Sequence, residues 1–183
     1  MKQAMSIMAF LLISHINHDL SVIQSGMEDY TIQEETHSVA GMLKPCSDSS
    51  VKSYMDRTKI TNTASDQHAY IEEHMEARIG HWFDKEGYVG VALGSWFGSI
   101  GTRWIFYLSS GEVLHTVKIE EKADEHTING CQHINDGSVI EFVIDQDTNT
   151  YWIGSNGLIV NGNYNNLDHF NGKIEWVKKE STD

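Results

Sequence analysis

The chain has 183 residues, of which 40% are hydrophobic, and carries 13 basic against 26 acidic side chains, a formal net charge of −13. This composition is that of an ordinary globular protein and excludes a wholly disordered chain. A surface this acidic repels the phosphate backbone and anionic lipid, so we expect no nucleic-acid partner and no binding to an anionic membrane surface.

The N-terminal segment, residues 1–17, contains an apolar run from Ala4 to Ile13 behind a single Lys2. The run is too short to cross a bilayer, so no membrane span is expected. It resembles the hydrophobic region of a secretory signal, and we therefore predict a secreted or cell-surface protein. The residues just downstream, 15–18, are not the small residues of a cleavage site. A short apolar helix that packs on the domain is the alternative.

Residues 18–54 are rich in polar side chains and hold the only proline, Pro45. This composition predicts a linker or a loosely ordered arm. The two cysteines, Cys46 and Cys131, are too few for a disulfide-stapled miniprotein or a four-cysteine zinc site. They form either one disulfide outside the cell or two thiols inside it, and the sequence leaves this choice open.

The folded domain is predicted over residues 55–180, and its first clear element is a helix over 65–79. Ser65 is a suitable N-cap, and Gly80 is placed to end the helix. Apolar residues recur at helical spacing and give one buried stripe, made of Ile71, Met75 and Ile79.

Beyond residue 86, short runs of β-branched and aromatic residues alternate with glycine-marked turns. The predicted strands are 88–93, 104–108, 112–119, 138–145, 151–153, 158–160 and 174–177. Many short strands with one helix favour a mainly β fold, a small closed barrel of six to seven strands, over a parallel sheet with crossover helices.

Glu141 is the first candidate for a catalytic residue. In a strand over 138–145, alternation places Glu141 on one face between Val139 and Val143. A carboxylate among apolar side chains is harder to ionise, which is the condition that a general acid needs near neutral pH. The alternative is an ordinary solvent-exposed strand face.

A second cluster precedes that strand. Asp124 and His126 are two residues apart, so they share a face if the segment is extended. The pair could relay a proton, or it could supply two metal ligands with His133 or His115 as a third. The spacing matches no zinc signature, so we predict no metal site and no cofactor.

Three aromatic residues are candidates for stacking on sugar rings, and packing in the core is the alternative for each. They are Trp96, Phe97 and Trp104.

In blocks that follow one another along residues 55–180, the domain resembles a group of proteins from Gram-positive gut bacteria and their phages. The resemblance spans roughly residues 55–180, and its blocks are 55–63, 91–95, 100–102, 110–113, 122–127 and 137–145. More distantly, the layout is similar to double-psi β-barrels of the cell-wall type, including the 3D domain, RlpA-like proteins, MltA-type lytic transglycosylases and expansins. In this comparison Asp124 matches the first acid and Glu141 the second, catalytic one, which is aspartate in the lytic barrels.

The resemblance implies a peptidoglycan or other cell-wall glycan as partner. In a lytic transglycosylase-like reaction, Glu141 would protonate the glycosidic oxygen with Asp124 or His126 in support, and the sugar's 6-hydroxyl would close an anhydro ring. A non-catalytic glycan-binding module, with Trp96, Phe97 and Trp104 in contact with sugar, is the second hypothesis. A phage tail or assembly protein with a non-catalytic barrel is the third.

Overall fold

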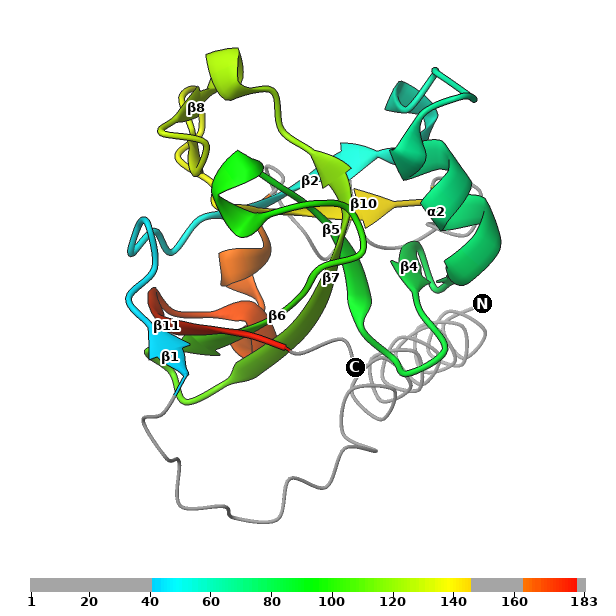
Figure 1. Ribbon diagram of the computed structural model, residues 1–183. Helices are drawn as coiled ribbons and strands as arrows, with labels where there is room; N and C mark the ends of the chain where they lie inside the picture. The colour runs from blue at the N-terminus through cyan, green and yellow to red at the C-terminus, as the bar shows by residue number, and fades with distance from the viewer. Residues whose placement is uncertain (1–40, 146–162, 181–183) are drawn as a thin grey trace, which may run out of the picture. The chain divides into compact units, whose positions relative to one another are not determined.

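Strands make up most of the regular structure, and the prediction of a mainly β domain with one helix is confirmed in the described part of the chain (Figure 1). The computed structural model describes residues 41–145 and 163–180. The strands are β1 (Met42–Leu43), β2 (Lys52–Asp56), β3 (Glu76–Arg78), β4 (His81–Phe83), β5 (Val89–Leu93), β6 (Arg103–Leu108), β7 (Val113–Glu121), β8 (Thr127–Ile128), β9 (Gln132–His133), β10 (Ile140–Ile144) and β11 (Ile174–Lys179), and the α-helix is α2 (Asp66–His74).

Nine of these strands form one mixed sheet, and β8 pairs with β9 in a separate hairpin. Along the sheet the order is β1-β11-β6-β7-β5-β10-β4-β3, with β2 paired to β10 off this path. Two pairs are parallel, β5 with β7 and β10 with β2, and the other pairs are antiparallel. Segments that are far apart in the sequence therefore meet at β10, which pairs with β2, β4 and β5.

β10 is buried on both faces, which explains why its residues other than Glu141 are apolar. Val143 belongs to a core cluster with Ile71 of α2 and Val117 of β7. On the opposite face, Phe142 contacts an aromatic group contributed by β4 and the C-terminal segment, made of His81, Tyr164 and Phe170. The alternation expected from the sequence is confirmed, and neither face of the strand is a free surface.

The helix begins where the sequence predicts and ends earlier. Ser65 is the N-cap, and its hydroxyl accepts a hydrogen bond from the His68 N–H at 3.2 Å. The predicted end at Gly80 is wrong, because α2 stops at His74 and residues 76–78 form β3. Ile79 and Gly80 have φ angles of 50° and 78° and make the two-residue turn between β3 and β4, a conformation that fits the twist of a tight hairpin.

Some sequence predictions lie outside the described residues, namely the N-terminal segment 1–17, most of the arm, and the strands at 151–153 and 158–160. The described part of the predicted arm contains β1, Cys46 and the first residues of β2. Among the described residues, no helix is long and apolar enough to span a membrane.

The strand pairings do not close the sheet into a barrel, since β1 and β3 end the path. The segment before β2 does contact β11 through a backbone hydrogen bond. The Ile174 N–H, at the start of β11, donates to the Ser49 carbonyl at 3.3 Å. The mainly β part of the prediction therefore holds, and a closed barrel goes beyond the observed pairing.

His81 makes the stability of this core depend on pH. The imidazole is buried, with Nδ1 3.1 Å from the Ile79 carbonyl and Nε2 2.8 Å from the Tyr164 hydroxyl. Burial lowers the pKa of His81 to about 4, against the opposing effect of the bond to Ile79. Between pH 6.5 and 4 the unfolded chain therefore takes up a proton that the folded chain does not, and stability falls by up to about 3 kcal/mol.

We expect the fall on acidification to be shallower in the His81→Gln variant than in the wild type. Urea unfolding at pH 7, 6 and 5 measures both slopes, and His115, whose pKa burial also lowers, contributes equally to the two proteins. If stability fell equally steeply with pH in both proteins, His81 would not be the cause of the pH dependence.

Candidate functional site

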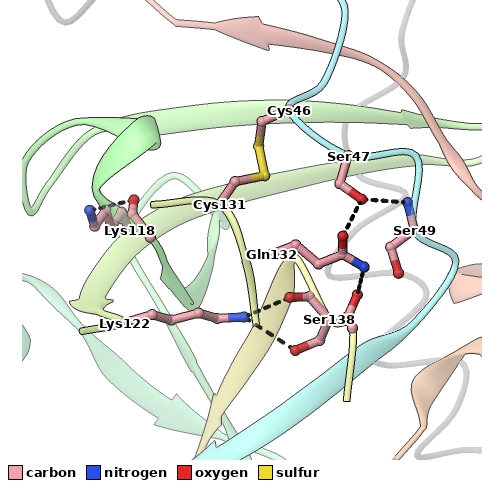
Figure 2. Close-up of a disulfide and its surroundings, with 10 residues drawn as sticks. Cys46, Ser47, Ser49, Lys118, Lys122, Cys131, Gln132 and Ser138 are labelled. Carbon is pink, nitrogen blue, oxygen red and sulfur yellow. Dashed lines mark hydrogen bonds between the residues drawn. A yellow bond between two sulfur atoms is a disulfide. The ribbon is translucent and has the colours of Figure 1, made fainter. Parts of the chain in front are cut away.

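The candidate residues gather on and beside one loop, residues 122–138, which we name the tethered loop. It carries the short 3₁₀ helix Asp124–His126 and the β8–β9 hairpin, and it leads from β7 to β10. A disulfide between Cys46 and Cys131 ties it to the N-terminal part of the domain (Figure 2). Gln132 adds a second link, because it accepts a hydrogen bond from the Ser47 hydroxyl at 3.1 Å and donates one to the Gly137 carbonyl at 2.9 Å.

The two ends of the tethered loop are joined by a buried lysine. The Lys122 ammonium donates to the Ser138 carbonyl at 3.1 Å and to the Ser138 hydroxyl at 3.2 Å (Figure 2). The same ammonium lies 3.1 Å from Glu141 Oε1. Burial lowers the pKa of Lys122, and the charges of Glu141 and Asp136 act in the opposite direction. A buried charge with several partners fixes the geometry of the loop, since moving it would leave the ammonium uncompensated.

Two glycines bring the tethered loop against the turn after β5. A Cβ on Gly94 would collide with the Gly130 carbonyl, and a Cβ on Gly130 would collide with the Ser95 hydroxyl. Gly130 has a φ of +65°, a conformation that glycine adopts without strain. This close approach allows the Trp96 N–H to donate to the Gly130 carbonyl at 2.9 Å. Trp96 therefore lies directly beside the tethered loop.

Glu141 lies where the strand alternation puts it, between two fully buried valines, Val139 and Val143. Its side chain is 14% exposed, so the sequence alternative of an ordinary exposed strand face does not apply. Its surroundings are not purely apolar, because the Lys122 ammonium and the Ser138 hydroxyl both donate to Oε1. The carboxylate is thus one half of a buried ion pair.

Asp124 and His126 do not lie side by side on an extended strand, because both belong to the 3₁₀ helix of the tethered loop. Asp124 Oδ1 accepts a hydrogen bond from the Ser95 hydroxyl at 2.5 Å. His126 is exposed, and its ring packs edge-on against that of His133 with centroids 6.3 Å apart. The two residues therefore contact different neighbours. Asp124 contacts the turn that contains Trp96, and His126 contacts the β8–β9 hairpin.

His133 and Asp136 form a second polar group near Glu141. His133 Nδ1 lies 3.2 Å from Asp136 Oδ1, which also accepts a hydrogen bond from the Ser138 N–H at 2.9 Å. Partial burial opposes ionisation of Asp136, but the hydrogen bonds from Ser138, with smaller effects of Ser53 and His133, lower the pKa of Asp136 below its ordinary value. Each of His133, Asp136 and Glu141 offers one ligand atom, and these atoms lie within 4.8 Å of one another.

The three aromatic candidates divide into one exposed and two buried side chains. Trp96 is 39% exposed, whereas Phe97 and Trp104 are 0% and 4% exposed. The Trp104 indole donates to the Phe97 carbonyl at 2.9 Å, which satisfies its polar atom inside the core. The Trp96 ring packs on both, with centroids 4.8 Å from Phe97 and 5.7 Å from Trp104. Of the three, Trp96 is the one with ring surface available to a ligand.

Sequence reasoning missed Lys122, Asp136 and Ser138 as functional candidates. Lys122 is 19 positions from Glu141 along the chain, and no local pattern links the two. The sequence Asp136-Gly137-Ser138 did indicate a turn. An aspartate side chain can accept a hydrogen bond from the N–H of the residue two positions later, as Asp136 does from Ser138. As a metal ligand, the sequence prediction considered His133 with Asp124 and His126.

Comparison with known proteins gives no match for this chain, whether with family models, curated proteins or solved structures.

We expect the disulfide to make a large contribution to stability. It closes a loop between positions 85 residues apart, and loop closure of this length stabilises the folded state by about 4 to 5 kcal/mol in the chain-entropy model. The double variant Cys46→Ser/Cys131→Ser should lose about this much free energy of unfolding in a urea titration.

Reductant should destabilise the wild type and leave the double variant unchanged, which serves as the control. A wild type insensitive to reductant under unfolding conditions would show that the bridge contributes little.

Proposed function

We propose that this chain is a secreted domain that binds a cell-wall glycan, with peptidoglycan as the first candidate. The observation that carries the proposal is the exposed Trp96 ring, held in place by the buried rings of Phe97 and Trp104. A flat, rigidly mounted aromatic surface suits the apolar face of a sugar ring.

Polar groups flank this ring as a glycan requires. Ser95 and Asp124 are hydrogen-bonded to each other next to Trp96, and Asp124 is exposed. Hydroxyl and carboxylate groups beside an aromatic ring can exchange hydrogen bonds with sugar hydroxyls. The acidic charge of the chain favours a neutral glycan strand over an anionic polymer.

The disulfide supports secretion. Structural disulfides persist in oxidising compartments and are rare in the cytosol. The Cys46–Cys131 bridge holds the tethered loop beside Trp96, so the proposed binding surface depends on an oxidising environment.

The proposed fold is a closed six-stranded double-psi barrel. The six strands with five or more residues follow one another in the order β2, β10, β5, β7, β6 and β11. The two parallel pairs β2–β10 and β5–β7 support the proposal, and the bond between Ile174 and Ser49 lies where the first and last of these strands would close the ring.

Glycan cleavage by Glu141 is the second candidate, and its near-complete burial between two valines favours it. A general acid must deliver a proton, however, and the Lys122 ammonium 3.1 Å away stabilises a negatively charged partner. The ion pair is why we place binding before cleavage.

Sedimentation with purified peptidoglycan, freed of anionic wall polymers, tests the binding proposal. We expect saturable binding by the full chain and at least a tenfold loss of affinity in Trp96→Ala, about 1.4 kcal/mol or more. The Leu43→Ala variant removes another exposed apolar side chain, on β1 at one end of the strand path, and should bind like the wild type.

Glu141→Gln separates binding from cleavage in the same assay. Under the binding proposal, mass spectrometry finds no soluble sugar products from either protein. Anhydro-sugar fragments that disappear in Glu141→Gln would instead establish lytic cleavage. A wild type that neither sediments nor releases soluble sugar products would reject both.

A further inference from the structure

His133, Asp136 and Glu141 form a compact group of metal-ligand types that the proposed glycan surface does not use. His133 ends β9, Asp136 lies in the following turn, and Glu141 is the second residue of β10. One ligand atom from each lies within 4.8 Å of the others. His133 Nδ1 and Asp136 Oδ1 are 3.2 Å apart, close to the separation of about 3.4 Å between two ligands of a tetrahedral ion with bonds of about 2.0 to 2.1 Å.

The backbone holds the turn between these residues in a fixed shape. The His133 N–H donates to the Ser138 carbonyl at 2.8 Å, and the Gly137 N–H donates to the His133 carbonyl at 3.0 Å. The turn is also anchored at both ends, by the disulfide at Cys131 and by the Lys122–Ser138 hydrogen bonds. A ligand group that is already in place loses little conformational entropy when an ion binds.

Both carboxylates have the supporting hydrogen bonds that orient metal ligands. Asp136 accepts from the Ser138 N–H, and Glu141 accepts from the Ser138 hydroxyl and the Lys122 ammonium. Both contacts of Glu141 use Oε1, so a metal ion can bind through Oε2. With one ammonium and two carboxylates the group carries a net charge of −1 when His133 is neutral, which a divalent cation reverses to +1.

The mixture of ligand types selects the class of metal. Ca²⁺ and Mg²⁺ take oxygen ligands, six or more of them, whereas an imidazole with carboxylates suits Zn²⁺ and related transition-metal ions. His133 and Asp136 have 22% and 41% of their side chains exposed, so an ion can reach them from solvent.

We propose that His133, Asp136 and Glu141 bind one divalent transition-metal ion of the Zn²⁺ class. This site differs from the prediction made from sequence, which foresaw no metal site and considered Asp124 and His126 as ligands with His133 or His115 as a third. The proposal does not rest on glycan binding, because none of the three residues belongs to the Trp96 surface. A Glu141 carboxylate bound to metal would not be available as a proton donor.

Isothermal titration of the full, disulfide-bonded chain with Zn²⁺ tests the site. We expect one saturable site, at least a tenfold loss of affinity in His133→Gln and in Asp136→Asn, and no saturable binding of Ca²⁺. The asparagine keeps a side-chain oxygen for the Ser138 N–H while removing the charge. Glu141→Gln is less informative, since it also leaves the buried Lys122 without its carboxylate.

His169→Gln is the matched control. His169 Nδ1 lies 2.8 Å from Glu112 Oε2, with side-chain exposures of 25% and 41% that nearly equal those of His133 and Asp136. Within the described residues that pair has no third ligand, so His169→Gln should bind Zn²⁺ like the wild type. Thermal unfolding of each variant without metal checks that it is folded.

Absence of a saturable Zn²⁺ site in the wild type would overturn the proposal. So would equal affinities in folded wild type, His133→Gln and Asp136→Asn, or an equal loss in His169→Gln. The Trp96→Ala variant should bind Zn²⁺ normally, so that a failed metal titration and a failed glycan sedimentation remain separate results.

Discussion

In the described part of the chain three lysine ammonium groups are buried, and each holds a loop in place beside the sheet. Lys52 donates to the carbonyl of Gly172 ahead of β11, Lys118 to those of Gly94 and Gly98 after β5, and Lys122 to that of Ser138 ahead of β10. Burial lowers the pKa of Lys52 to about 8, because water no longer solvates the ammonium fully. A charge withdrawn from water destabilises the protein unless its partners stay in place. The loops therefore take their positions from the sheet, although they contain little regular structure of their own.

The tethered loop shows how several such constraints converge on one place. The Lys122 ammonium fixes its two ends, the Cys46–Cys131 disulfide fixes its middle, and the backbone contact between Gly94 and Gly130 sets it against the Trp96 turn. An exposed loop held at three points can present side chains as rigidly as a strand does. The loop thereby carries residues of both proposed sites, namely Asp124 beside Ser95 and Trp96, and His133 with Asp136.

Local features of this fold could be predicted from the sequence, and features that depend on distant residues could not. Ser65 caps α2, and the alternation of β10 is as expected, because both depend on neighbouring residues. The helix was predicted too long because Ile79 and Gly80 fit a helix end as well as a hairpin turn, and strands of three residues such as β3 leave almost no periodic signal. The partners of Glu141 could not be predicted from the sequence for another reason. Lys122 directly follows β7, and only the folded structure shows that its ammonium meets this carboxylate.

Glu141 is where the alternative functions of this domain conflict. Ion pairing with Lys122 requires the charged carboxylate, and so does binding of a metal ion. Protonation of a glycosidic oxygen requires the neutral acid. The first two states are compatible, since Lys122 and Ser138 engage Oε1 and a metal ion can use Oε2, whereas the third excludes both. The buried ammonium at 3.1 Å therefore favours a Glu141 that organises the tethered loop over one that donates protons, and it leaves the proposed recognition of a glycan to Trp96.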